Sequence, residues 1–277
     1  MKRVAAITIL YNFDENVLNN IKTYDEFVDE VVLVDNSDTD NYYKKYREKL
    51  NKYTYISMHG NKGIATATNN AISYLLERGY EWAIIFDQDS YVEMNIIDKY
   101  FGVMENLKDD KIIIYSPIYV FDRRKIKHVK EISELKYVMQ SANLVNLKLV
   151  KKIGMLKDNF FIDMVDYEFC LRARKKGYKI VQCGNAKIKH SPGITRISPI
   201  LKIKYGYCNK IRIYYQARNL LWTFKEYHNF SMLGILFYKF IKIVFFFDNK
   251  KEYLKYYFKG ISDCQKNKFG VYKNDKE

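Results

Sequence analysis

The sequence predicts an α/β protein: a Rossmann-like, mostly parallel sheet with flanking helices, followed by a helical extension. In the first half, short apolar runs alternate with polar windows of helical spacing, and this alternation is typical of a parallel sheet with helices on both faces. After about residue 200 the pattern is helical, and aromatic and basic residues occur together. The 277 residues are enough to bury a substantial core.

The runs and windows of the first half follow one another in a regular order. We expect strands at residues 4–11, 30–34, 54–58 and 82–86, and helices at residues 16–27, 43–52 and 63–78. The first run follows Met1-Lys2-Arg3 and imitates a signal peptide, but it is short and no small-residue cleavage site follows. We interpret it as a buried strand.

The remaining elements are more mixed and then helical. They are strands at residues 112–116 and 178–182, a helix at 166–176 that ends before Gly177, and helices over 200–227 and 230–247. The last helix is apolar but contains Lys239 and Lys242. These lysines argue against a membrane span and favour a helix lying in the membrane plane; a core helix is the alternative.

Charge and cysteine content narrow the class of protein. Lys and Arg number 47 and Asp and Glu 32, so the net charge is +15. This excess predicts an anionic partner: a nucleic acid, a phosphorylated ligand or a membrane face. The four cysteines form no CxxC pair, which argues against a zinc site or disulfide framework and favours a reducing cytosol.

Carboxylates follow two of the predicted strands, where ligands bind in parallel sheets. Asp87 and Asp89 come after the strand at 82–86. In an extended segment both side chains point the same way and can share one hard divalent cation; an Asx-rich turn is the alternative. Asp35 ends the strand at 30–34 and can accept a hydrogen bond from a base or ribose, or simply form a turn.

Glycines and small residues open the helix at 63–78, from Gly60 through Ala67. Small side chains let a ligand approach the backbone, and a helix N-terminus favours a phosphate; an ordinary glycine turn is the alternative. The segment is neither GxGxxG nor a Walker loop, which disfavours a dinucleotide dehydrogenase and a P-loop NTPase.

Three carboxylates stand at the start of the helix at 166–176: Asp163, Asp166 and Glu168. Helix capping explains one of them. Bulky apolar neighbours would raise the pKa of the others toward that of a general base. A lone histidine such as His190 is usually structural, but beside Asp87 and Asp89 it becomes a third metal ligand.

Taken in order, these segments resemble family 2 glycosyltransferases with the GT-A fold, over residues 3–222. The likeness is closest to the bacterial rhamnosyltransferase-like members that build surface polysaccharides. Its motifs are Tyr11-Asn12, Val34-Asp35-Asn36, Asn61-x-Gly63-x-Ala65 with Asn69, Asp87-x-Asp89, and Tyr214-Tyr215-x-x-Arg218-Asn219. Val165 stands where the family usually has Glu, before the base.

The resemblance implies a role for each matching residue. Asp166 is the implied catalytic base, with Asp163 as the alternative. The implied metal ligands for Mg²⁺ or Mn²⁺ are Asp87, Asp89 and His190. The implied donor-binding residues are Tyr11, Asn12, Asp35, Asn36, Asn61, Gly63, Ala65, Asn69, Asp87 and Arg218. Residues 1–110 would bind the nucleotide sugar, residues 111–222 would bind the acceptor, and residues 223–277 would form amphipathic helices.

The function implied is an inverting, metal-dependent transfer of one sugar. Rhamnose from dTDP-rhamnose is the first choice, and galactose, glucose or N-acetylhexosamine from UDP are alternatives. The acceptor would be a polyprenyl-diphosphate-linked saccharide of capsule, O-antigen or cell-wall synthesis, at the inner face of the cell membrane. The Gln-x-x-Arg-Trp signature of processive synthases is missing, so we expect a single addition.

Two other classes are compatible with part of the sequence. The net charge and the tyrosines allow a nucleic-acid-binding or nucleotidyl-transferring protein. The basic residues, however, gather around an apolar segment, so we expect no nucleic-acid partner. A non-catalytic membrane scaffold is the other class, and the presence of Asp87, Asp89 and Asp166 argues against it.

Overall fold

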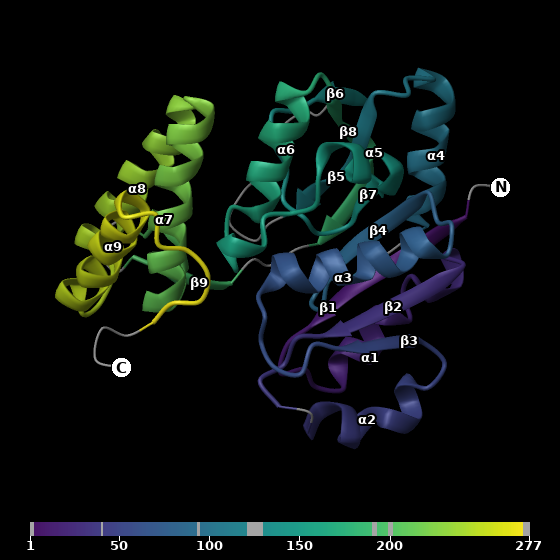
Figure 1. Ribbon diagram of the computed structural model, residues 1–277, viewed down its shortest axis with the longest axis horizontal. Coiled ribbons are helices and arrows are strands. Elements are labelled where there is room, and N and C mark those ends of the chain that lie inside the picture. Colours follow the sequence, from purple (N-terminus) through teal and green to yellow (C-terminus); the bar gives the residue numbers. More distant parts are fainter. Residues whose placement is uncertain are drawn as a thin grey trace.

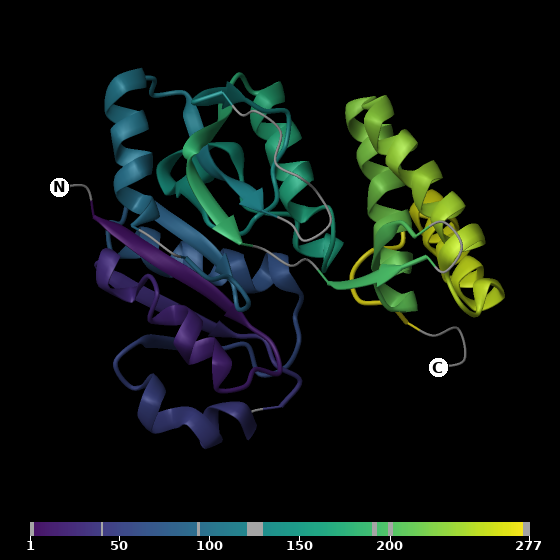
Figure 2. The same cartoon turned by 180° about the vertical axis from the view of Figure 1, so that it is seen from behind.

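The computed structural model describes residues 3–39, 41–92, 95–120, 130–189, 193–198 and 202–273. The first part of the chain forms an α/β body, and the helices of the last part gather beside one end of it (Figure 1). The view from behind shows the same separation of the α/β body from these helices (Figure 2).

In the described part of the chain, the main sheet has eight strands in the order β3-β2-β1-β4-β7-β5-β8-β6. They are β1 (Val4–Leu10), β2 (Glu30–Asp35), β3 (Thr54–Ser57), β4 (Trp82–Asp87), β5 (Ile112–Val120), β6 (Ile132–Glu134), β7 (Asn143–Asn146) and β8 (Lys179–Lys189). The strands β3, β2, β1 and β4 are parallel, as the alternating pattern predicts. Strand β7 is antiparallel to both β4 and β5, so the sheet is mixed, and the short strands β6 and β7 were not predicted.

Helices cover both faces of this sheet. They are α1 (Asn16–Ile21), α2 (Asn41–Leu50), α3 (Ile64–Glu77), α4 (Ile96–Leu107), α5 (Leu147–Ile153) and α6 (Val165–Lys175), with 3₁₀ turns at Asp25–Phe27 and Asp158–Phe160. Alternate residues of β1 face opposite sides: Val4 and Ala6 pack with α1, α2 and α4, whereas Ala5 and Ile7 pack with α3, α5 and α6.

The last part begins with a pair of strands. Strands β9 (Ile194–Ile197) and β10 (Lys204–Tyr207) are antiparallel. The helix predicted from residue 200 was therefore wrong at its start. Helix α7 begins only at Lys210, because Asn209 caps it by accepting a hydrogen bond from the Arg212 N–H at 2.9 Å.

Three helices complete the chain: α7 (Lys210–Tyr227), α8 (Phe230–Phe246) and α9 (Lys250–Gln265). They share a core in which Ile213 of α7, Met232 of α8 and Tyr257 of α9 are buried. The predicted C-terminal helices are thus confirmed, and α7 packs with them as one helical unit.

Helix α8 has one buried and one exposed apolar face. Met232, Leu236 and Ile243 are buried, whereas Phe230, Phe237 and Phe245 are 73%, 64% and 67% exposed. Within the described ranges, no helix combines the length and the apolar character that a membrane crossing needs. The exposed aromatic side chains leave a stripe along α8 that the helical unit does not cover.

Candidate active site

A pocket of about 600 Å³ lies between the α/β body and the helical unit. Asp87, Asp89, Asp163 and Asp166 line it from the body. The helical unit contributes polar and basic side chains, among them Arg212, Gln216, Tyr238, Lys239 and Lys242. The structure therefore brings together three residues that the sequence predicted to act in one site: Asp87, Asp89 and Asp166.

The segment after β4 is a tight turn. The Ser90 N–H donates to the Asp87 carbonyl at 3.0 Å, and the Ser90 hydroxyl accepts a hydrogen bond from the Asp87 N–H at 3.1 Å. The extended conformation predicted for Asp87 through Asp89 was therefore wrong, and the two carboxylates are presented by a turn. Asp87 is half-buried and Asp89 is exposed.

Gln88 connects this turn to the end of β1. Its side-chain oxygen accepts a hydrogen bond from the Tyr11 N–H at 2.7 Å, and its carbonyl accepts one from the Asn20 side chain at 2.9 Å. The residue between the two carboxylates thus holds the turn beside the predicted nucleotide end of the sheet.

Tyr11 and Asn12 lie next to the end of β2. The Tyr11 hydroxyl and the Asn12 side-chain amide donate to the same carboxylate oxygen of Asp38, at 2.9 and 3.0 Å. The Asn12 N–H donates to the Ser37 hydroxyl at 2.8 Å. Both predicted residues therefore belong to one polar network at the carboxyl ends of the strands.

Asp35, Asn36 and Asn61 extend the same network. Buried Asp35 accepts hydrogen bonds from the Ser37 N–H, at 2.9 Å, and from the Tyr55 hydroxyl. The Asn36 amide donates to the Asn61 side-chain oxygen at 3.1 Å. The sequence did not predict the contact with Tyr55. Tyr55 lies opposite Leu33, two residues before Asp35, and this place depends on the pairing of β2 with β3.

Asp163 and Asp166 have different surroundings. Arg212 donates two hydrogen bonds to Asp163, at 2.7 and 3.1 Å, and Gln216 donates a third at 3.3 Å. Burial opposes the charge of Asp163, but the Arg212 guanidinium prevails and the pKa of Asp163 is lowered. No local pattern marks Arg212, which lies 49 residues along the chain.

Asp166 has different charged neighbours from Asp163. Its carboxylate accepts a hydrogen bond from the Tyr167 N–H at 2.9 Å, and no cation of the described ranges forms an ion pair with it. Burial, followed by the nearby carboxylates of Asp87 and Asp163, raises the pKa of Asp166 to about 7. A carboxyl group with this pKa can hold or release a proton near neutral pH.

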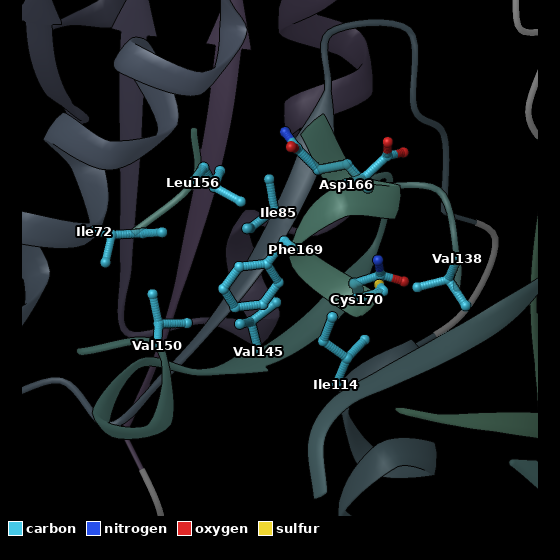
Figure 3. Close-up of a pocket in the computed structure, with 12 residues that line it drawn as sticks. Ile72, Ile85, Ile114, Val138, Val145, Val150, Leu156, Asp166, Phe169 and Cys170 are labelled. Atoms are coloured by element: carbon cyan, nitrogen blue, oxygen red, sulfur yellow. The ribbon is translucent and has the colours of Figure 1, made fainter. Parts of the chain in front are cut away.

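The apolar side chains beneath Asp166 explain this burial. They enclose a small cavity of about 30 Å³, whose lining includes Ile85, Ile114 and Phe169. Figure 3 shows the Asp166 carboxylate at the edge of this apolar group, pointing away from Phe169. These apolar neighbours thus desolvate the Asp166 side chain, and Asp166 also lines the larger pocket.

Of the ten predicted donor-binding residues, Asp87 alone lines the pocket. Four of the other nine are Gly63, Ala65, Asn69 and Arg218. They contact the segment before α6, residues 156–165. A Cβ on Gly63 would lie 2.6 Å from the Phe161 carbonyl oxygen, and Ala65 packs against Phe160 and Val165. The small size of both residues is thus used by the protein's own packing.

Asn69 and Arg218 bind the backbone of that segment. Asn69 donates to the Leu156 carbonyl at 2.9 Å and accepts from the Leu156 N–H at 3.0 Å. The Arg218 guanidinium donates to the Phe160 carbonyl at 3.0 Å. Their polar groups are therefore occupied in positioning the chain that carries Asp163 and Asp166.

A metal at this site would rest on few protein ligands. His190, the predicted third ligand, lies outside the described residues. Within the described residues, no group of three or more His, Cys, Asp or Glu side chains is arranged to hold a metal. Asp87 and Asp89 on one turn suit Mg²⁺, which proteins commonly bind through one or two carboxylates together with substrate phosphates.

Comparison with known proteins relates this chain to a family. Residues 7–183 match the model of the glycosyl transferase family 2. The dTDP-rhamnosyl transferase RfbF of Shigella flexneri is 29% identical over 255 residues, which cover 84% of this chain and 83% of that protein.

Two solved structures share the fold. GalNAc-T7 with UDP, GalNAc and Mn²⁺ superposes with a TM-score of 0.57 at 11% identity, over 78% of this chain and 48% of that one. Staphylococcus aureus TarS 1–349 in complex with UDP superposes with a TM-score of 0.50 at 16% identity, over 69% and 61%. The chain thus spans about half the length of the first structure. The likeness to these two structures confirms the predicted GT-A fold. Because the family model covers more than half of the chain, the protein is a glycosyltransferase that belongs to glycosyl transferase family 2 and resembles its rhamnosyltransferases.

Proposed function

We propose that this protein transfers one rhamnose from dTDP-rhamnose to the hydroxyl group of an acceptor saccharide, with inversion at the anomeric carbon. The likeness to RfbF over most of both chains supports the donor. The observation that carries the reaction is the position of Asp166, whose pKa is raised to about 7 and which shares its pocket with Asp87 and Asp89.

The donor would lie along the carboxyl ends of β1, β2 and β4. Tyr11, Asn12, Asp35, Asn36 and Asn61 form a polar network at the first two strands, where a nucleotide base and ribose would bind. The diphosphate would then reach the turn that carries Asp87 and Asp89.

A divalent metal, Mg²⁺ or Mn²⁺, would be held by Asp87 and Asp89 together with the diphosphate, with His190 as a further proposed ligand. When bound, the metal supplies positive charge that stabilises the departing diphosphate. The family and the exposure of Asp89 at the pocket support this assignment.

Asp166 would act as the general base. Its carboxylate takes the proton of the acceptor hydroxyl, whose oxygen forms a bond with the anomeric carbon. The bond from that carbon to the diphosphate breaks, and the nucleoside diphosphate leaves with the electron pair. Asp163 is unsuited to this role because Arg212 stabilises its ionised form.

The acceptor would be a polyprenyl-diphosphate-linked saccharide at the inner face of the cell membrane. Helix α8 supports this proposal because it serves two surfaces at once. Tyr238, Lys239 and Lys242 line the pocket, while Phe237 and Phe245 are exposed. An amphipathic helix with aromatic residues on its exposed face is typical of proteins that lie on a membrane.

A panel of nucleotide sugars tests the donor. We expect dTDP-rhamnose with Mn²⁺ to raise the melting temperature of the purified protein, because binding to the folded state alone stabilises it by about 2.7 kcal/mol at a hundredfold excess over Kd. Chelation with EDTA should remove this shift. UDP-glucose, UDP-galactose and UDP-N-acetylglucosamine are the competing donors.

Transfer is measured next, as the product formed on a short-chain polyprenyl-diphosphate N-acetylglucosamine. Rhamnosylated product that disappears in the Asp166→Asn variant supports the proposal. Stabilisation and transfer with a UDP sugar alone would show that the donor is wrong. The absence of transfer from every donor of the panel would overturn the reaction itself.

A further inference from the structure

Two adjacent residues of α7, Arg218 and Asn219, bind the backbone of the segment that precedes α6. Both are 0% exposed. The Asn219 side-chain nitrogen lies 3.1, 2.9 and 2.9 Å from the carbonyl oxygens of Phe160, Ile162 and Asp163. The two N–H donors of one amide group are thus shared among three carbonyls of residues 160–163, just before the proposed base.

Arg218 reaches the start of the same segment. Its guanidinium donates to the carbonyls of Asn159 and Phe160, at 3.3 and 3.0 Å, and to that of Gly270 at 2.9 Å. The Arg218 Nε–H donates to the Asn219 side-chain oxygen at 3.0 Å, which orients the amide so that its nitrogen faces the segment. The two residues therefore act as one hydrogen-bonded unit.

The segment that they bind has an unusual backbone. Phe161, Asp163 and Met164 have φ angles of 65°, 62° and 68°. Residues other than glycine adopt such values at a cost, and they keep them only where the surrounding structure holds them in place. The three carbonyls bound by Asn219 lie just before, between and at these strained positions.

The strained segment also determines where two carboxylates lie. Asp163 is itself one of the strained residues, and its side chain binds Arg212, two turns before Asn219 on α7. Asp166 follows immediately in the first turn of α6. A relaxed backbone at 161–164 would change the entry into α6, and with it the place of the Asp166 carboxylate in the pocket.

We propose that Arg218 and Asn219 are positioning residues that hold residues 159–164 in the strained conformation required to place Asp166 for proton transfer. This inference rests on the proposed role of Asp166 and adds a task for the helical unit. Helix α7 then not only lines the pocket but also determines the position of the Asp166 carboxylate. The alternative is that the two residues stabilise the fold without affecting the reaction.

The test compares Asn219→Ala with a matched control, Thr223→Ala, in the full chain. Thr223 is one turn further along α7 and equally buried, and its hydroxyl bonds within the helix, to the Asn219 carbonyl at 2.7 Å. Both variants should lower the melting temperature. Only Asn219→Ala should lower kcat, by about a hundredfold with the donor KM unchanged, since a shift of about 1 Å at a reacting group has effects of this size.

A second variant, Arg218→Lys, tests the same role with a milder change. A second measurement, hydrogen–deuterium exchange, does not depend on the yield of folded protein or on the reaction. Arg218→Lys keeps the charge but loses the planar fork of donors, and should lower kcat less than Asn219→Ala does. Hydrogen–deuterium exchange of the peptide spanning residues 157–164 should be faster in Asn219→Ala than in wild type, and unchanged in Thr223→Ala.

The outcomes separate the two proposals. A folded Asn219→Ala protein with wild-type kcat would overturn the positioning role, as would equal exchange of the 157–164 peptide in all three proteins. If the wild-type chain transfers no sugar from any nucleotide donor, the proposed function fails. The exchange experiment still reports in that case whether Arg218 and Asn219 hold the segment.

Discussion

Arg212 binds Asp163 through two N–H groups, at 2.7 and 3.1 Å, although the two residues lie on different elements, α7 and the segment before α6. This ion pair makes the carboxylate of Asp163 chemically different from that of Asp166, although the two look equivalent in the sequence. Asp163 is held in its ionised form, whereas burial beside other carboxylates raises the pKa of Asp166. Pairs of acids whose surroundings push their pKa values apart commonly take different roles in a reaction.

Replacement of each acid by its amide should separate these roles. We expect Asp166→Asn to lower kcat by about 10²–10⁴-fold, because the loss of a positioned general base has effects of this size. Asp163→Asn should instead lower the free energy of unfolding by about 1–3 kcal/mol, since Arg212 loses a charged partner. Kinetics and urea unfolding of both variants measure these effects. Near-normal transfer by Asp166→Asn would contradict the assignment.

The reaction rate should depend on pH through Asp166. The base must be ionised to accept a proton, so kcat should rise with pH, pass its half-maximum near the pKa of about 7, and level off above it. Rates measured between pH 5.5 and 9 at saturating donor, approximately the range over which such a group titrates, give this profile. A profile that is flat below pH 7 would argue that Asp166 is already fully ionised.

A substitution of Gly63 tests whether its small size serves packing against Phe161 rather than contact with a ligand. We expect Gly63→Ala to lower the free energy of unfolding by about 1–3 kcal/mol more than Gly79→Ala does. Both glycines have positive φ angles, 87° and 76°, but a Cβ on Gly63 would meet the Phe161 backbone whereas one on Gly79 would meet open space. Equal losses in the two variants, measured by urea unfolding, would show that the contact with Phe161 is unimportant.

The exposed stripe of α8 predicts membrane binding. Phe237→Glu should weaken binding to vesicles of anionic phospholipid by about tenfold or more, because a buried Phe side chain contributes about 1.5–3 kcal/mol. The control is Phe27→Glu, which changes an exposed Phe on the α/β body. Vesicle sedimentation measures both. Equal retention of the two variants, or no binding by wild type, would exclude this stripe as the contact surface.

Sequence patterns correctly predicted those structural features that depend on neighbouring residues along the chain. The four parallel strands at the start of the sheet were predicted because their apolar runs are separated by helical windows. Three of them, β1, β2 and β4, are buried on both faces, as their nearly continuous apolar runs indicate. The carboxylates at the ends of β2 and β4 were predicted for the same reason, since strand ends locate them. Strand β7 was missed because its four residues, Asn143–Asn146, begin and end with Asn and are ordered by pairing with β4 and β5.

The roles of individual site residues depended on partners far away in the chain. Gly63 and Arg218 belong to recognisable motifs, yet the structure shows both against the segment that carries Asp163 and Asp166. The sequence by itself determined the fold class and the set of acidic residues, because apolar periodicity and strand ends are local properties. Only the tertiary structure decided which acid is paired and which titrates, because burial and the field of a distant Arg212 are properties of the packed molecule.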